Sequence, residues 1–378
     1  MNKIVVASDS FKGSLSSLDV ATSAILGIKE VYPNCQVVAV NVADGGEGTV
    51  DAIVDALNGQ IVTCTVSNPL GDPVEASYGV ANDVAVLEMA AASGLPLIPS
   101  SKRNPWITST YGTGEMIMDA IDRGCRKFLI GIGGSATNDA GMGMLQALGF
   151  QFYDANNELI KTGCGGSLSA IARIDDSRVP KAVKESVFTI ACDVDTPFCG
   201  PDGAAPVFAP QKGADADMVK QLDAGMASFA QVIQQQYGLN IVPVEGAGAA
   251  GGMGGAFLAF LGATLKKGID MVLDAIDFNA TIAGADLVIT GEGKVDFQTA
   301  KGKTAAGVLK RAQQQGIPVI AIGGRVELCD SLLQIGFAGI YPILEEKVPL
   351  ELAMQRDFAM ENVRKTLVKI MTGYLNKN

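Results

Sequence analysis

The sequence predicts an α/β protein of two domains: a doubly wound (Rossmann- or flavodoxin-like) parallel sheet built from both chain ends, and a second α/β domain inserted between them. At 378 residues the chain exceeds what one small core accommodates. Near both ends, short apolar runs precede a glycine-containing loop and a helical pattern, which is typical of parallel strands covered on both faces. Shorter runs in the middle, broken by turn residues, indicate antiparallel strands.

Two strand–loop–helix units occupy the N-terminal end. The apolar run KIVVAS at 3–8 precedes the loop DSFKGSLS, and a helix is predicted at 17–32. The run QVVAVNV at 36–42 precedes the loop ADGGEG, and a helix is predicted at 49–57. Because ligands of open α/β sheets bind at the carboxyl ends of the strands, we expect both loops to line a binding site.

The rest of the chain continues this alternation. Residues 59–90 contain short runs broken by NPLGDP, whereas 127–149 return to strand, glycine loop and helix. Toward the C-terminus, the run DLVIT at 286–290 precedes a charged loop and a helix at 304–316, and a long amphipathic helix is predicted at 350–375.

The domain boundaries follow from these patterns. Residues 1–70 and 280–378 are predicted to form the doubly wound domain, and residues 71–279 the inserted α/β domain. The active site is expected in the cleft between the two domains, where loops that follow strands would meet.

Composition narrows the possible partners. The net charge of −11 argues against nucleic acid, whose phosphates are bound by basic surfaces. Seven cysteines without a CxxC pair are typical of reduced thiols in the cytoplasm, and the first apolar run is too short for a signal peptide. The uncharged segment 246–265 has the length of a membrane span, but its seven glycines favour a glycine loop that opens a buried helix. We expect a cytoplasmic protein without membrane contacts, either a monomer or a homodimer.

The absence of one residue type limits the chemistry. The chain has no histidine, which excludes serine–histidine–aspartate triads, cysteine–histidine pairs and histidine-ligated metals. Acid–base steps therefore fall to Asp, Glu, Lys, Tyr or water. Any metal is expected to be a hard ion that prefers oxygen ligands, such as Mg²⁺.

The loop IGIGGSATNDAGMG at 130–143 is the strongest candidate for a phosphate site. Gly133 and Gly134 allow the backbone to approach an anion closely. Polar side chains are supplied by Ser135, Thr137 and Asn138. The helix that follows is expected to point its N-terminus at the charge. The alternative is a tight turn capped by serine and asparagine.

A second glycine segment, GAGAAG at 246–251, matches the GxGxxG pattern of dinucleotide sites, with Asp270 downstream. It continues into GMGG and follows a poor strand pattern. Anion binding or helix packing is therefore favoured over dinucleotide binding for Gly251, Gly252 and Gly254.

The segment GEGKVDFQTAKGKT at 291–304 resembles a Walker A loop only superficially, because Phe297 stands where that pattern requires glycine. The candidate functional residues of this segment are Glu292, Asp296, Lys301 and Lys303. Carboxylates and ammonium groups in a loop after a parallel strand suit Mg²⁺ and phosphate together. A solvated charged loop is the alternative.

Charged residues also follow other strands. Asp9, Ser10 and Lys12 come after the first strand, where lysine can hold a carboxylate or a phosphoryl group. Asp193 and Asp195 follow a buried run, where a carboxylate can accept a proton from an attacking hydroxyl. Alternatively, Ser10 caps a helix and one of the two aspartates is a turn residue.

The loop ADGGEG combines Asp44 and Glu47 with three glycines, Gly45, Gly46 and Gly48. Glycine costs backbone entropy, so this loop indicates shaping around a polar ligand. Together the loops supply the positioning and charge neutralisation that phosphoryl transfer demands. We therefore predict a small-molecule kinase that uses ATP and Mg²⁺. The rival classes are an NAD(P)-dependent hydroxy-acid oxidoreductase and a non-catalytic solute-binding protein.

The chain also resembles the bacterial type-1 glycerate kinase family. The resemblance is carried by DSFKGSLS, ADGGEGT, RNPWITSTYGTGE, GIGGSATNDAGMGMLQALG, ACDVDTPF, FAPQKGA, GAGAAGGMGGAFLAFLGA and DLVITGEGKVDFQT, in this order along nearly the whole chain. It implies two α/β domains with the active site between them. It also implies phosphorylation of glycerate by MgATP, with (R)-glycerate as substrate and the 2-phosphate favoured over the 3-phosphate.

The resemblance further implies roles for single residues. The catalytic set is Asp193, Lys12, Asp44 and Glu47. The glycerate-binding set is Asp9, Ser10, Gly45 and Gly46. The nucleotide- and phosphate-binding set is Gly133, Gly134, Ser135, Asn138, Gly251, Gly252, Gly254 and Lys303, and the metal ligands are Glu292 and Asp296. Two positions depart from the family pattern: Lys294 replaces the commoner arginine and so lacks its bidentate fork, and Trp106 replaces a smaller apolar residue.

Overall fold

The structure, a computed structural model, describes residues 1–46, 48–344 and 348–376. The chain divides into two compact units. Unit 1 comprises residues 1–44, 55–57 and 272–378, and unit 2 comprises residues 45–54 and 58–271. The helices α2 (Thr49–Ala56) and α10 (Gly268–Ala275) each contribute residues to both units. Residues 60–67, which the sequence prediction placed in the first domain, form a strand of the sheet in unit 2.

Unit 1 is built on a five-stranded sheet. Its order is β13 (Gly339–Pro342), β12 (Val319–Val326), β11 (Leu287–Val295), β1 (Lys3–Ser8) and β2 (Gln36–Asn41). All neighbouring strands are parallel. In chain order this is the flavodoxin-like arrangement 2-1-3-4-5, whose ligands bind where the winding reverses, here between β1 and β11. The predicted parallel α/β sheet is confirmed.

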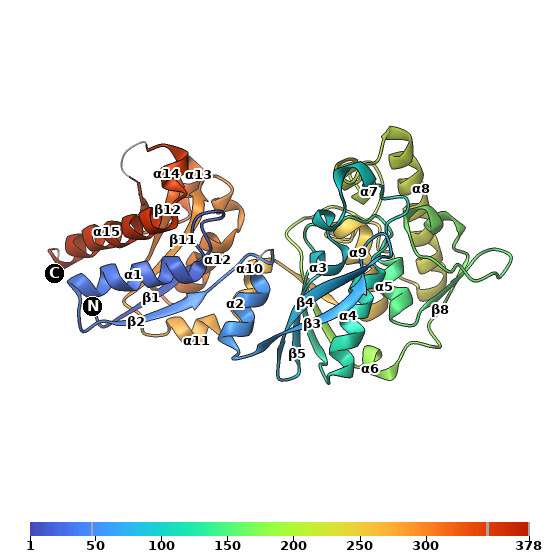
Figure 1. Ribbon diagram of the computed structural model, residues 1–378, viewed down its shortest axis with the longest axis horizontal. Helices are drawn as coiled ribbons and strands as arrows, with labels where there is room; N and C mark the ends of the chain where they lie inside the picture. Colours follow the sequence, from blue (N-terminus) through green and yellow to red (C-terminus); the bar gives the residue numbers. More distant parts are fainter. Residues whose placement is uncertain (47, 345–347, 377–378) are drawn as a thin grey trace. The chain divides into compact units, whose positions relative to one another are not determined.

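Helices cover this sheet (Figure 1). They are α1 (Ser17–Val31), α11 (Phe278–Ile282), α12 (Thr304–Gln313), α13 (Asp330–Gln334), α14 (Leu350–Ala353) and α15 (Arg356–Leu375). α1 and α15 pack together and bury one face, with Ile4 and Val6 of β1 in the same cluster. Val5 and Ala7, which alternate with them and point to the other face, are equally buried. α12 packs against β1, β11 and β12.

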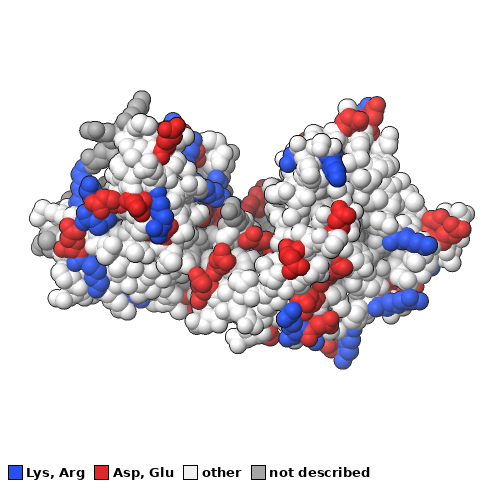
Figure 2. All heavy atoms as spheres, in the orientation of Figure 1, with Lys and Arg blue, Asp and Glu red and all other residues white. Residues whose placement is uncertain are grey.

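The C-terminal helix predicted at 350–375 is two helices. Gln355 adopts an extended backbone with ψ 123° between α14 and α15, so α15 begins only at Arg356. Ion pairs link α15 to α1: Arg356 pairs with Asp19, and Arg364 pairs with Glu30. Figure 2 shows acidic and basic side chains side by side over this face of unit 1. Ion pairs at least partly open to solvent contribute only about 1 kcal/mol each.

Unit 2 contains a mixed six-stranded sheet. Its order is β10 (Thr264–Lys266), β9 (Val187–Ala191), β6 (Lys127–Gly131), β5 (Val84–Glu88), β4 (Pro73–Ala81) and β3 (Gln60–Ser67). The strands from β10 to β5 are parallel, and β3, β4 and β5 are antiparallel neighbours. The antiparallel pairing predicted for the middle of the chain is therefore confirmed. A separate two-stranded sheet joins β7 (Gln151–Tyr153) and β8 (Arg173–Asp175).

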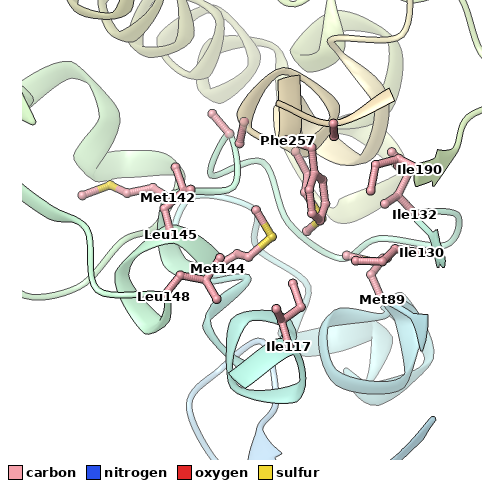
Figure 3. Close-up of a cluster of buried hydrophobic side chains, with 14 of the residues drawn as sticks. Met89, Ile117, Ile130, Ile132, Met142, Met144, Leu145, Leu148, Ile190 and Phe257 are labelled. Atoms are coloured by element: carbon pink, nitrogen blue, oxygen red, sulfur yellow. The ribbon is translucent and has the colours of Figure 1, made fainter. Parts of the chain in front are cut away.

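The helices of unit 2 enclose a large apolar core. They are α3 (Ala90–Ser93), α4 (Tyr111–Asp122), α5 (Met142–Ala147), α6 (Lys181–Lys184), α7 (Ala204–Phe208), α8 (Ala216–Tyr237) and α9 (Ala249–Leu261). Phe128 and Phe188 stack with ring centroids 4.8 Å apart. Figure 3 shows Ile130, Ile132 and Met144 converging with other buried side chains of this core, so the chain on both sides of the 133–139 loop is anchored in it.

The glycine-rich segment 246–265 opens α9, as predicted. Gly251 and Gly252 have left-handed backbones inside it, so the regular helix starts after them. Most of the helix is buried in the core of unit 2. Among the described residues, no helix is both long enough and apolar enough to cross a bilayer.

Candidate active site

In unit 1 the strand β11 is longer than the sequence predicted. Residues from Gly291 onward were expected to form a loop, but β11 pairs with β12 as far as Val295. Glu292 and Lys294 therefore lie two residues apart in a strand and face the same side of the sheet. Glycine weakens a strand, and here pairing with a neighbouring strand outweighs that tendency.

Asp9 lies at the point where the winding of the sheet reverses. Its N–H donates to the Gly291 carbonyl of β11 at 3.0 Å. Its carboxylate accepts hydrogen bonds from the Ser10 N–H at 2.7 Å and from the Thr304 hydroxyl at 3.1 Å. Burial, and then the nearby charge of Asp44, raise the pKa of Asp9, while Lys12 opposes the shift. The four predicted residues Asp9, Ser10, Lys12 and Asp44 thus share one region.

Glu292 is the most unusual carboxylate of unit 1. Its side chain is buried, and its Oε1 atom has no hydrogen-bond partner. Burial raises its pKa to about 7, although Thr299 and Lys303 act in the opposite direction. A buried carboxylate oxygen without a partner costs free energy, which a bound cation would offset.

Asp296 differs from Glu292 because it already has partners. Its carboxylate contacts the Lys294 ammonium at 2.8 Å and accepts the Gln298 N–H at 2.8 Å. The Lys294 contact lowers the pKa of Asp296. Lys294 also pairs with Glu327 at 2.9 Å, so its ammonium is engaged by two carboxylates. Within residues 1–46, 48–344 and 348–376, no group of three or more carboxylate or thiol side chains is arranged to hold a metal.

In unit 2 the loop after β6 exposes two glycines. A Cβ added to Gly133 would meet nothing within 4 Å, and Gly134 has a left-handed φ of +74°. Among the described residues, none accepts a hydrogen bond from the N–H groups of Gly133 or Gly134. The neighbouring Ser135 hydroxyl accepts a hydrogen bond from the Lys212 ammonium at 2.7 Å. The loop thus presents free backbone donors of the kind that bind anions.

The prediction that a helix N-terminus faces the anion is wrong. α5 starts only at Met142, and the amide groups at its start donate to Asp139 and to the Thr110 hydroxyl. Asp139 accepts hydrogen bonds from Gly141 N–H at 3.1 Å and Gly143 N–H at 3.2 Å. It also accepts from the Thr110 N–H at 2.8 Å and hydroxyl at 2.7 Å. This buried carboxylate therefore closes the helix end.

Asn138 is fully buried beneath the loop. Its amide nitrogen lies 3.2 Å from the Met226 sulfur, and its Oδ1 has no partner. The Thr137 hydroxyl is likewise buried and unpartnered. The geometry gives Asn138 no exposed path to a ligand in this conformation.

Gly251, Gly252 and Gly254 are also buried and pack against other backbone. A Cβ on Gly251 would lie 2.2 Å from the Thr137 carbonyl oxygen, and the Gly251 carbonyl accepts the Ala140 N–H at 3.0 Å. The glycine segment at 251–254 therefore packs against residues 137–140 of the loop that follows β6. Between α8 and α9 the structure contains no strand, so the strand–turn–helix context of a dinucleotide fingerprint is missing there.

Asp193 and Gly45 lie at the carboxyl edge of the sheet of unit 2. The Asp193 carboxylate accepts the Gly268 N–H at 3.0 Å. A Cβ on Gly45 would lie 2.8 Å from Cβ of Ala191, and one on Gly131 would lie 2.5 Å from the Gly45 carbonyl. Gly46 follows and is partly buried. Glu47 lies outside the described residues.

Some residues of both regions escaped the sequence prediction. Glu88 ends β5 beside Gly131 of β6, and its carboxylate lies 3.5 Å from the Val50 N–H. The apolar run before Glu88 is the same signal that pointed to Asp193. Thr304 and Lys212 carry no such signal, because their partners lie 295 and 77 residues away in the chain.

Comparison with known proteins supplies independent information. The model of the glycerate kinase family matches residues 4–374. Glycerate kinase of Bacillus subtilis (strain 168) is 49% identical over 356 residues, covering 93% of each chain. Glycerate 2-kinase of Escherichia coli (strain K12) is 48% identical over 324 residues, covering 85% of each chain. The crystal structure of a Salmonella typhimurium LT2 protein assigned as glycerate kinase 2 superposes with a TM-score of 0.91 at 42% identity, covering 100% of this chain and 99% of that one.

Proposed function

The chain belongs to the glycerate kinase family, and from that premise we propose that it transfers the γ-phosphoryl group of ATP to the 2-hydroxyl of (R)-glycerate. The choice of the 2-hydroxyl rests on the similarity to a relative named glycerate 2-kinase. In this reaction the bond from glycerate O2 to phosphorus forms, the bond from phosphorus to the ADP oxygen breaks, and the hydroxyl proton passes to a base.

We assign the base to Asp193. It directly follows a parallel strand, and its hydrogen bond from the Gly268 N–H fixes the orientation of the carboxylate. The proposed glycerate-binding residues are Asp9, Ser10, Lys12, Asp44, Gly45, Gly46 and Glu47. Lys12 would supply a positive charge for the carboxylate of glycerate. The Asp9 side chain is held in place by the hydrogen bonds that it accepts from Ser10 and Thr304.

The phosphates of ATP are assigned to the loop that exposes Gly133 and Gly134, together with Ser135 and Lys303. The free N–H groups of the two glycines are the observation that supports this assignment. Asn138 and the three glycines of the second loop are proposed to act through the shape of the first loop, given their burial.

Mg²⁺ fits Glu292 better than any other described carboxylate. The unpartnered Oε1 of Glu292 is a hard oxygen ligand, and Asp296 is a second donor nearby in sequence. Mg²⁺ is usually bound through one or two carboxylates plus substrate phosphates, so a site of two carboxylates suffices. When bound, the ion supplies neutralisation of the phosphate charge.

The proposal is tested by following ADP release with MgATP and each glycerate enantiomer. We expect ADP formation that depends on (R)-glycerate and stops when EDTA removes divalent cations. ADP release without glycerate, or none with either enantiomer, would contradict the proposed acceptor. A nicotinamide absorbance assay with glycerate and NAD(P) should remain flat.

A further inference from the structure

Lys212 is a fully buried lysine in a short turn of unit 2. It closes the segment Pro210–Lys212 ahead of Gly213, and its side chain is 1% exposed. A buried ammonium is costly unless its N–H groups and its charge are matched by neighbours. The partners of Lys212 therefore indicate what the charge does.

Both hydrogen-bond partners of Lys212 belong to the 133–139 loop. The ammonium donates to the Ser135 hydroxyl oxygen at 2.7 Å and to the Thr137 carbonyl at 2.6 Å. The opposite charge that acts on Lys212 is Asp139, whose carboxylate accepts four hydrogen bonds from Thr110, Gly141 and Gly143. The ammonium thus donates to Ser135 and Thr137, and not to the carboxylate that balances its charge.

This contact determines how Ser135 can bond. A hydroxyl has one donor hydrogen, and here its oxygen already accepts the ammonium. The Ser135 hydrogen is therefore left to point elsewhere, and a hydrogen bond from a charged donor strengthens the next bond in a chain. Ser135 directly follows the exposed Gly134, whose N–H has no acceptor among the described residues.

We propose that Lys212 is a positioning residue that presets the Ser135 hydroxyl as a donor to an anionic substrate oxygen held at Gly133–Ser135. The inference rests on the proposed function for the identity of the anion, which is a phosphate of ATP or the carboxylate of glycerate. Lys212 itself touches no substrate in this scheme.

The protonation state of Lys212 supports this role. Burial lowers its pKa to about 7, and the charge of Asp139 limits the shift. Among the described residues, Asp139 is the charged group that acts on Lys212. The ammonium form, which can donate to both partners, is therefore favoured below about pH 7 and is lost as the pH rises.

The test is a double-mutant cycle of Lys212→Met and Ser135→Ala. Binding of ADP and of (R)-glycerate is measured separately by calorimetry at pH 6.5, with thermal unfolding recorded for each variant. Losses at such supporting positions are on the order of 10- to 100-fold. We expect Lys212→Met to weaken one of the two ligands by about tenfold, and that ligand identifies the anion.

In the Ser135→Ala background, Lys212→Met should add less than about twofold, because both changes remove the same interaction. Losses that multiply independently, or unchanged binding of both ligands by a folded Lys212→Met variant, would overturn the inference. The exposed Lys220, paired with Asp217 on α8, provides the control Lys220→Met, which should bind both ligands as the wild type does.

If Lys212→Met does not fold, the inference is tested through the pH dependence of ligand binding by the wild type. Affinity for the same ligand should fall between pH 7 and pH 9 as Lys212 loses its proton, and Ser135→Ala should lose this pH dependence. An equal fall in both proteins would contradict the inference. Wild-type protein that binds ADP but does not phosphorylate glycerate would refute the proposed function while leaving Lys212 to be judged by the cycle.

Discussion

The two units present different kinds of chemistry at the carboxyl edges of their sheets. Unit 1 presents carboxylates and lysines, among them the buried Glu292, whose Oε1 has no hydrogen-bond partner. The loop after β6 in unit 2 presents exposed backbone at Gly133 and Gly134, with its charges, Asp139 and Lys212, buried beneath it. Side chains can neutralise a metal or a charge directly, whereas a backbone loop needs support to keep its shape. The buried charges of unit 2 are best understood as that support.

The largest predicted loss of activity comes from a side chain of unit 2, Asp193, and it is therefore the exception to this difference between the units. Asp193→Asn should lower kcat by about 100- to 10,000-fold, the usual contribution of a general base. ADP binding, measured by calorimetry, should remain within about twofold of wild type. Loss of ADP binding at nearly normal kcat would show that Asp193 serves the nucleotide and not the proton.

Two glycine variants distinguish a glycine that is needed for close packing from one that is exposed. Gly251→Ala should lower the free energy of unfolding by about 2–4 kcal/mol, because its Cβ would lie 2.2 Å from the Thr137 carbonyl. Gly133→Ala should leave stability within about 0.5 kcal/mol, because its Cβ would meet open space. Denaturant titration of both variants checks this. Equal stability losses would remove the distinction between the two loops.

In unit 1, Glu292 and Asp296 should respond to neutralisation in opposite directions. Glu292→Gln should raise the free energy of unfolding at pH 8 without Mg²⁺ by about 1–3 kcal/mol, since it removes a charge whose burial outweighs the help of Thr299 and Lys303. Asp296→Asn should lower it, because Lys294 loses a partner. Both variants should have reduced activity. A destabilised Glu292→Gln variant would mean that the carboxylate is already well compensated.

The last prediction concerns the dependence of stability on pH. The pKa of Lys212 is about 7 in the folded protein and near 10.5 in the unfolded chain. Between these values the unfolded state binds one more proton at Lys212, so the free energy of unfolding rises with pH. Relative to Lys212→Met, wild-type stability should therefore increase from pH 7 to pH 10. A constant difference would mean that the folded pKa of Lys212 is not lowered.

The sequence predicted the architecture well because its signals are local. Apolar runs followed by glycine identified β1, β2 and β6, and the turn residues of 68–73 identified the antiparallel hairpin. The sequence prediction was wrong where contacts between distant residues determine the structure. Pairing with β12 carries β11 through two glycines, and Asp139 closes a helix end that looked open to a ligand.

The candidate site shows the same limit. Aspartates after apolar runs are visible in the sequence, whereas Lys212 lies in a turn with no pattern and contacts Ser135 only in the folded chain. Gly251 ends a segment that matched a ligand motif, but in the fold its small size is used for close packing. A glycine motif indicates that the backbone can adopt unusual conformations, but tertiary packing determines whether a ligand or another part of the chain lies against it.

The identity of the phosphorylated hydroxyl tests the proposed reaction most directly. Purified protein, MgATP and (R)-glycerate are incubated with enolase but without phosphoglycerate mutase, and both ADP and phosphoenolpyruvate are followed. Phosphoenolpyruvate should form in proportion to ADP, because enolase acts directly on 2-phosphoglycerate. ADP release without phosphoenolpyruvate would contradict transfer to the 2-hydroxyl and indicate the 3-phosphate instead.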